Sequence, residues 1–187
     1  MTFPTCRLRH SISSLAVTLS FCLVAVYAAA DPIVITDVFG LQAMSSDPTA
    51  AYVMGNDIDA SDTVNWNDGA GFIPVGDVSG YFSGTFDGAG FTISNLHIAP
   101  VSGNAGLFNR LRTFDGEVAT RYVGNVVLEN AFVSGVNGSG ALAAYAWDYE
   151  IFDVSVSGSI TGYTAGGIAV RIERGSTISR CDAAVTV

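Results

Sequence analysis

The chain has 187 residues, 21 of them glycine, and eight basic residues against seventeen Asp and Glu, so its net charge is −9. Such an acidic balance repels nucleic acid and anionic membranes and argues against both as partners. Lysine is absent, and Cys181 is the only cysteine after residue 30, so no disulfide is expected within residues 31–187.

Residues 1–30 have the order of a secretory signal peptide. Arg7 and Arg9 precede a mostly apolar run at 15–26, and three alanines at 28–30 precede Asp31. Cleavage before Asp31 is therefore predicted, with a retained membrane anchor as the alternative. No later segment is long and apolar enough to span a bilayer. We expect a secreted or cell-surface protein with a single domain, residues 31–187. In that domain six arginines face seventeen acids, a net charge of −11.

The first predicted element is a short helix over residues 38–44, which would cap the N-terminal end of the domain. An acidic loop follows at 56–62, with the sequence NDIDASD. Asp57, Asp59 and Asp62 are hard oxygen ligands with no basic residue nearby, so Ca²⁺ is a candidate cofactor. The loop lacks the spacing of an EF-hand, and a solvated acidic loop is the alternative.

A glycine-rich stretch at 80–98 raises the question of a ligand loop. Gly88-Ala89-Gly90 does not continue into a dinucleotide-binding motif, because no helical pattern follows it. A turn at 87–90 between core residues is the better interpretation. The core residues predicted around this turn are Phe82, Phe86, Phe91 and Ile93.

Three sequence markers recur in the same order, and repetition of this kind is typical of stacked coils. Short apolar strands between glycine or polar corners predict an all-β chain. Because no strand could form a stable sheet alone, we predict a right-handed parallel β-helix, or β-solenoid, with bends at 94–95 and 124–125. The first marker is Ile93/Leu96/Ile98, Val123/Val126/Leu128, Ile151/Val154/Val156 and Ile178/Cys181/Ala183; the second is Val101-Ser102-Gly103, Val133-Ser134-Gly135 and Ile160-Thr161-Gly162; the third is Gly106-Leu107-Phe108, Ala141-Leu142-Ala143 and Gly167-Ile168-Ala169.

The run FSGTFDGAGFTISNLHI at 82–98, with AGLF at 105–108 and GGIA at 166–169, resembles the GLUG-motif β-helical repeats of bacterial surface adhesins. The preceding segments at 52–61 and 72–76 look like those that open such arrays. The chain departs from this pattern at 140–144 and carries an insertion at 111–120. The resemblance implies a β-solenoid with a structural or adhesive role, and says less about function than about fold.

Catalytic chemistry finds little support in the sequence, and no catalytic residue is predicted. His97 is the only histidine after residue 30 and should face outward, while Cys181 occupies a predicted core position. The alternative function is a polysaccharide-active enzyme, a lyase or glycoside hydrolase, which would need two acids facing each other in a groove. The candidate acids are Asp57 with Asp59, and the cluster Asp148, Glu150 and Asp153.

A binding module for an extracellular glycan or protein would instead gather exposed aromatic residues on one face. The candidates are Tyr145, Trp147, Tyr149 and Tyr163. The last repeat, at 176–187, ends after its first marker and shows no polar cap. We therefore expect either a fragment of a longer array or self-association through the C-terminal coil.

Overall fold

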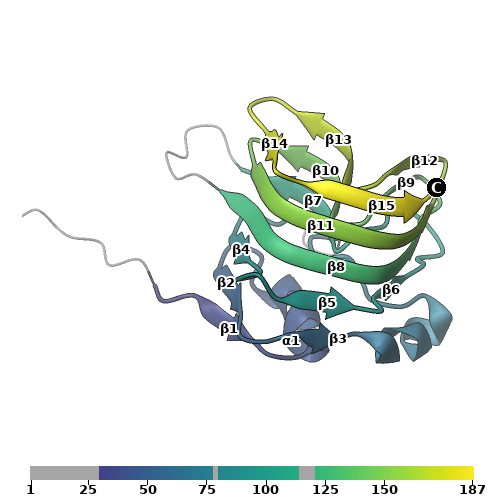
Figure 1. Cartoon of the computed structure of the whole chain (residues 1–187), viewed down its shortest axis with the longest axis horizontal. Coiled ribbons are helices and arrows are strands. Elements are labelled where there is room, and N and C mark those ends of the chain that lie inside the picture. The colour runs from purple at the N-terminus through teal and green to yellow at the C-terminus, as the bar shows by residue number, and fades with distance from the viewer. Residues whose placement is uncertain (1–29, 78–79, 114–120) are drawn as a thin grey trace, which may run out of the picture.

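The computed structural model describes residues 30–77, 80–113 and 121–187 (Figure 1). The predicted signal peptide and its apolar run lie outside the described residues, apart from Ala30. Most of the predicted insertion at 111–120 also lies outside them. In the described part of the chain, no helix is long and apolar enough to cross a membrane.

The described residues are mostly β, as predicted, with one short α-helix. The helix α1 occupies Val38–Ala43, and the carboxylate of Asp37 caps it by accepting the Gly40 N–H at 2.8 Å. Single 3₁₀ turns are η1 (Met44–Ser46), η2 (Ser61–Asn65) and η3 (Asn67–Gly69). The strands are β1 (Ile33–Ile35), β2 (Ala51–Met54), β3 (Ile58–Asp59), β4 (Thr85–Asp87), β5 (Thr92–Ser94), β6 (His97–Ile98), β7 (Phe108–Arg112), β8 (Tyr122–Ser134), β9 (Gly138–Gly140), β10 (Ala143–Trp147), β11 (Glu150–Thr161), β12 (Thr164–Gly166), β13 (Ala169–Glu173), β14 (Thr177–Ser179) and β15 (Asp182–Thr186).

The strands form three parallel sheets. The largest runs β1-β2-β4-β8-β11-β14, with β3, β5, β6 and β15 attached to its strands. The second has the order β13-β10-β7, and the third pairs β12 with β9. Figure 1 shows β5, β8, β11 and β15 stacked one above another, each about one repeat later in the chain. Every pairing between these named strands is parallel, so each connection must cross back over the molecule.

The later repeats have the predicted register. Val123 pairs with Ile151, and Ile151 pairs with Ile178. The third marker is also confirmed, since Ala143 pairs with Phe108 on one side and Ala169 on the other. These pairings put like residues of successive repeats directly above one another.

The first repeat differs from its predicted alignment. Ile93 pairs with Leu128 rather than Val123, and Phe86 takes the place opposite Val123. Val101 is 91% exposed, and Ile98 pairs with Val133 in its place. The predicted alignment of the first repeat was therefore wrong for the first and second markers. For the first marker, the observed partner lies five residues later in the chain than the predicted one.

The physical reason is that β8 has two similar bends. Asn125 and Asn130 both adopt left-handed conformations, with φ of 53° each. Each has an apolar residue two positions before it and another directly after it. Asn95 has the same conformation (φ 59°), and its side chain accepts a hydrogen bond from the Asn130 amide at 2.8 Å. Asn95 therefore lies next to Asn130, at the second bend. The sequence pattern apolar-x-Asn-apolar occurs at both bends and does not distinguish them.

Aromatic side chains that pack against one another fill the core of the early repeats. The rings of Phe82 and Phe86 lie 4.9 and 5.8 Å from that of Phe108, and all three are fully buried. Phe91 packs against this core but is only partly buried. The predicted turn is confirmed, because β4 ends at Asp87 and Ala89 and Gly90 both have positive φ.

Asp153 and Arg180 stand at the same corner of consecutive repeats and form a two-pronged ion pair, with N–O distances of 2.6 and 2.8 Å. The hydrogen bonds from Arg180 lower the pKa of Asp153 below its ordinary value. A carboxyl whose folded-state pKa is lowered adds stability above its unfolded pKa, about 3.9, and loses it as pH falls through the folded pKa.

We therefore expect Arg180→Gln to lower the melting temperature at neutral pH, and the difference between the two proteins to shrink as the pH falls and Asp153 becomes protonated. Melting curves of wild type and variant from neutral to acidic pH test the pair. Because both side chains are exposed, the difference should be small. A gap between the two proteins that stays constant with pH would contradict the assignment.

Candidate functional site

The candidate site lies on the outer face of the β13-β10-β7 sheet. Side chains alternate along residues 109–112 of β7, so Leu111 points into the core while Arg110 and Arg112 point out. Phe108, at the start of the strand, is also buried. On β10 the same alternation turns Tyr145 outward.

Parallel pairing aligns the outward residues in two rows. One row is Arg110, Tyr145 and Arg171, and the other is Arg112, Trp147 and Glu173. Neighbouring strands are about 4.8 Å apart, so members of a row are within reach of one another.

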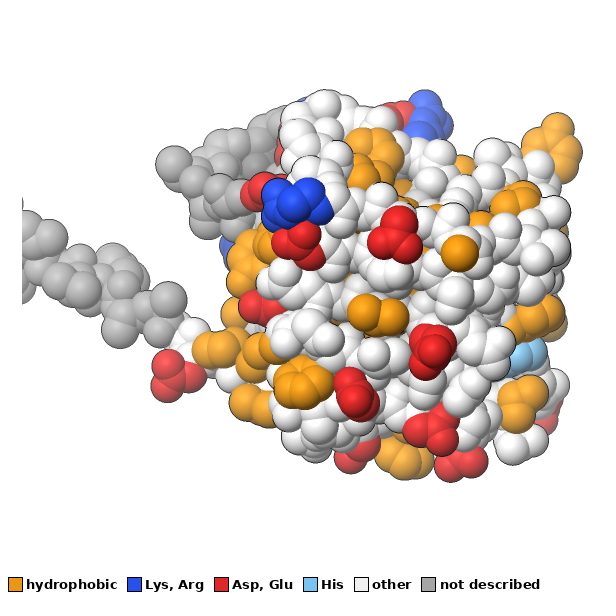
Figure 2. Space-filling view, in the orientation of Figure 1, with side chains coloured by type: hydrophobic (Ala, Val, Ile, Leu, Met, Phe, Trp, Pro, Cys, Tyr) orange, Lys and Arg blue, Asp and Glu red, His pale blue; other side chains and the backbone are white. Residues whose placement is uncertain are grey.

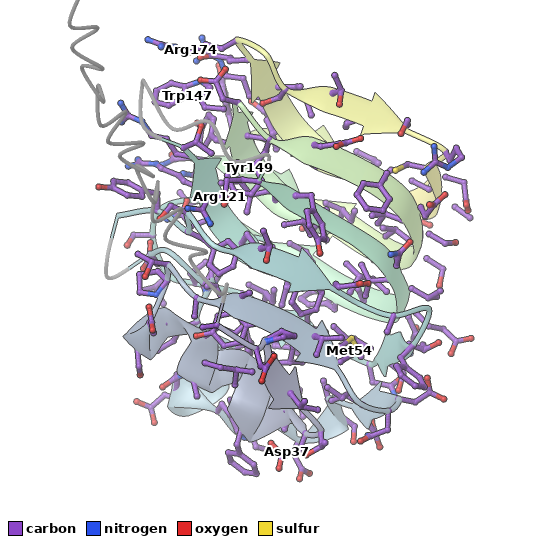
Figure 3. The ribbon with its side chains drawn as sticks, turned by 90° about the vertical axis from the view of Figure 1, so that its left-hand side faces the viewer. Asp37, Met54, Arg121, Trp147, Tyr149 and Arg174 are labelled. Carbon is purple, nitrogen blue, oxygen red and sulfur yellow. The ribbon has the colours of Figure 1, made fainter. Side chains whose placement is uncertain are left out.

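A groove of about 360 Å³ follows these rows. Its lining residues are Gly80, Tyr81, Arg110, Leu111, Arg112, Tyr145, Trp147 and Arg171. Three arginines and three aromatic rings thus meet on one face of an acidic protein. Figure 3 shows Trp147 at the opposite end of the molecule from Asp37 and helix α1.

The second row and Arg171 are held together by contacts among themselves. The indole N–H of Trp147 donates to the Glu173 carboxylate, which also forms an ion pair with Arg171. The guanidinium of Arg112 lies 4.8 Å from the centre of the Trp147 ring and 5.9 Å from that of Tyr81. Cation–π contact of this kind fixes the side chains before any ligand arrives.

The groove carries three guanidinium groups, and within residues 30–77, 80–113 and 121–187 only Arg171 of these has a carboxylate partner. Among the described residues, Glu173 pairs with Arg171, and neither Arg110 nor Arg112 has an acidic partner within ion-pair distance. Acidic side chains are spread instead over the face of the largest sheet (Figure 2). The structure therefore separates charge, with unpaired guanidinium groups on the aromatic face.

Two of the four aromatic residues predicted for a binding face belong to the groove, Tyr145 and Trp147. Tyr149 does not, because it is 1% exposed and its hydroxyl donates to the Gly84 carbonyl at 2.7 Å. Tyr163 is 93% exposed but follows β11, outside the groove lining. The prediction was wrong for these two, since sequence spacing did not show that Tyr149 turns inward.

Four groove residues were not predicted from the sequence: Tyr81, Arg110, Arg112 and Arg171. A signal existed in the alternating outward pairs Arg-x-Arg at 110–112 and Tyr-x-Trp at 145–147. Such pairs share a face only if both segments are strands, and share a groove only if those strands are neighbours. The 35-residue separation between them is longer than the later repeats and hid the relationship.

The predicted calcium ligands lie elsewhere, near η2 and β3. The Asp57 carboxylate accepts the Thr92 N–H at 2.8 Å. Asp59 accepts from the Ser61 N–H at 3.0 Å and the Asn95 amide at 3.2 Å, and these bonds, that of Asn95 foremost, lower its pKa. Asp62 lies in the first turn of η2. Within the described residues, no three His, Cys, Asp or Glu side chains come close enough to hold a metal ion.

Calcium binding by Asp57, Asp59 and Asp62 stays a prediction. It implies that millimolar Ca²⁺, the range of extracellular calcium modules, raises the melting temperature because the ion binds only the folded chain. The Asp59→Ala variant should lose that rise. A melting temperature that does not change with Ca²⁺ would leave the hydrogen-bonded loop as the whole account.

The two residues tested for catalysis have structural contacts. His97 projects outward as predicted, but its ring stacks on Phe132 at 4.8 Å and is only partly exposed. Cys181 is partly buried and its thiol donates to the Ser179 carbonyl at 3.1 Å. Burial raises the pKa of this thiol, which disfavours the reactive thiolate.

Comparison with known proteins gives one informative likeness. The chain is 38% identical over 143 residues to halomucin of Haloquadratum walsbyi. This match covers 72% of the chain but only 2% of halomucin, so the chain resembles a small part of a far longer protein. No family model matches the chain, and the GLUG motif remains a resemblance.

Proposed function

We propose that the chain is a non-enzymatic β-solenoid module with a structural and adhesive role, secreted or at the cell surface. The three parallel sheets would be the faces of a right-handed parallel β-helix, with each repeat as one coil and α1 as its N-terminal cap. The likeness to a segment of a protein named as a mucin supports an extracellular setting. The groove of Tyr145 and Trp147 is the observation that carries the adhesive role.

Aromatic side chains suit this role because they offer a large, rigid contact area and lose little conformational entropy on binding. The groove is open and runs across strands, so it can accept an extended ligand. We propose a glycan as that ligand.

The alternative, a polysaccharide-active enzyme, expects two carboxylates across an acidic groove. The groove on the β13-β10-β7 sheet is instead lined by three arginines. Glu173, beside it, is already bound to Trp147 and Arg171. Of the cluster predicted for catalysis, Asp148 accepts the Gly175 N–H at 2.9 Å and Asp153 pairs with Arg180. None of these observations favours the enzyme.

Binding to immobilised polysaccharides, both neutral and acidic, tests the proposal. Wild type should bind at least one of them, and Tyr145→Ala or Trp147→Ala should weaken binding about tenfold or more, the usual effect of losing a central aromatic contact. Tyr163→Ala, at a fully exposed tyrosine outside the groove, is the matched control. If no polysaccharide binds, or if all three variants behave alike, the groove is not the adhesive face.

The C-terminal repeat offers a second contact, with another copy of the chain. Among the described strands, β13, β14 and β15 each pair on one side only, so their outer edges carry unpaired backbone groups. Ile172 and Ile178 are 37% and 42% exposed, whereas Ile151 in the preceding repeat is fully buried. An open edge with partly exposed apolar residues favours pairing with a second chain.

We expect light scattering on residues 31–187 to show mass rising with concentration. Placing glutamate at both Ala184 and Val185 on β15 should reduce this association, because like charges would meet across the edge. The same substitutions at Ser157 and Ser159, on the internal strand β11, serve as the comparison. A protein that stays monomeric at high concentration would contradict self-association through this edge.

A further inference from the structure

We propose that the groove on the β13-β10-β7 sheet selects acidic saccharides, sugars that carry a carboxylate or sulfate, over neutral ones. This inference rests on the proposed function, since it names the ligand class of the same groove. It follows from the charges and their geometry rather than from the aromatic rings alone.

The charge argument begins with the scarcity of cations. The chain has eight basic residues and seventeen acidic ones, yet three of its arginines line this one groove. The N–H donors of a guanidinium group need hydrogen-bond acceptors. Elsewhere in the structure, the Asp153 carboxylate accepts two hydrogen bonds from Arg180. Among the described residues, Arg110 and Arg112 have no carboxylate partner of their own. An anionic ligand would supply the missing acceptor.

The geometry suits carboxylates or sulfates spaced along a chain. Arg110 and Arg112 are two residues apart on β7, so their backbones lie about 6.6 Å from each other on the same face. Each guanidinium has a planar fork of N–H donors that matches two oxygens of one acidic group. Two such groups side by side can bind successive acidic groups on an oligomer.

The aromatic residues favour a sugar as the carrier of these acids. Tyr145 lies directly between Arg110 and Arg171 in its row. A saccharide ring can therefore pack its apolar C–H face on the tyrosine while its acidic group reaches an arginine. An acidic peptide could also form ion pairs with the arginines. Its flexible Asp and Glu side chains, however, would make little packing contact with the flat tyrosine ring.

Glu173 has a positioning role in this arrangement. Its carboxylate holds both the Trp147 indole and the Arg171 guanidinium, on neighbouring strands. Counting only carboxylates that the structure describes, this leaves Arg110 and Arg112 without an ion pair at one side of the groove and the Arg171–Glu173 pair at the other. The positive potential is thus concentrated over β7, which sets the end of the groove where the acidic group should bind.

Calorimetric titration with defined probes tests the selectivity. The probes are a tetragalacturonate, its fully methyl-esterified form, a sulfated oligosaccharide of similar length, and a short poly-glutamate of matched charge. We expect binding of the tetragalacturonate, the sulfated oligosaccharide or both, weakening as salt rises. The methyl ester should bind at least about tenfold more weakly, because it keeps the ring but loses the charge-assisted hydrogen bonds.

Arg110→Gln and Arg112→Gln should each reduce affinity for the acidic probe about tenfold or more, and reduce affinity for the methyl ester less, because the ester makes no charge-assisted hydrogen bond. Arg180→Gln is the matched control, since it removes an arginine outside the groove. Melting curves of all three variants check that the fold is intact.

The outcomes separate the two proposals. Equal binding of the acid and its methyl ester would overturn the selectivity but leave the groove as a glycan site. Poly-glutamate binding as tightly as the acidic sugars would overturn it in favour of acidic peptides. Failure of every saccharide to bind would overturn both the selectivity and the adhesive role of the groove.

Discussion

We expect Phe108→Ala to lower the free energy of unfolding by about 3–5 kcal/mol, through lost apolar burial and the cavity left behind. Phe108 is fully buried, and its ring contacts those of Phe82 and Phe86. It also lies on β7, where its backbone pairs with Ala143. Alanine occupies the paired position in the next repeat, and the rings of Phe82 and Phe86 are themselves fully buried, so filling the space would require them to leave their packed positions.

Chemical denaturation of wild type and variant measures this loss. Phe39→Ala is the matched control, since Phe39 is 66% exposed and contacts Trp66 by stacking at 5.2 Å. Removing this ring should lower the free energy of unfolding by a smaller amount, about 1 kcal/mol. Equal losses for the two phenylalanines would mean that the core does not centre on Phe108.

The second large effect is expected at Gly158 on β11, opposite the point where β8 carries one extra residue between Leu128 and Ala131. Gly158 has a φ of +134°, which residues with a side chain rarely adopt, and an added Cβ would lie 2.0 Å from the Ala131 carbonyl oxygen. Strain of this kind is about 1–3 kcal/mol, and displacing packed backbone adds about 1–3 kcal/mol. Gly158→Ala should therefore lower the free energy of unfolding by about 2–6 kcal/mol.

Gly90→Ala separates the two contributions. Gly90 has a φ of +82°, but no atom lies within 4 Å of the position its Cβ would take. Only backbone strain remains, about 1–2 kcal/mol. If denaturation gives the same loss at both glycines, the close approach of β11 to β8 at Ala131 is not a real constraint.

Local patterns were sufficient for the later repeats. The predicted helix at 38–44 is present as α1 followed by η1, because Asp37 supplies an N-cap and Val38 and Leu41 supply a buried stripe. The third marker aligned correctly because its small residues stand where backbones come close. At Gly106 an added Cβ would lie 2.5 Å from the Gly140 carbonyl oxygen, which only glycine tolerates.

The first repeat could not be aligned from sequence because two bends within one repeat share one sequence pattern. Ile93 and Val123 are each followed, after two residues, by an apolar residue, with an asparagine just before it. Whether Ile93 stacks on Val123 or on Leu128 depends on where the chain crosses the molecule. That is set by the length of the connections, and the first repeat is separated from the next by 35–37 residues rather than 27 or 28.

The sequence by itself determined an acidic, mostly β chain with parallel repeats, because composition and apolar spacing act locally and recur with each repeat. The tertiary structure alone decided which side chains meet. Arg110, Tyr145 and Arg171 are 35 and 26 residues apart, and only the in-register pairing of β7, β10 and β13 places them in one row. Tyr149 was excluded from that face for a related reason. Alternation changes wherever the chain bends, and a bend at Asp148, with φ of 54°, turns the next residue into the core.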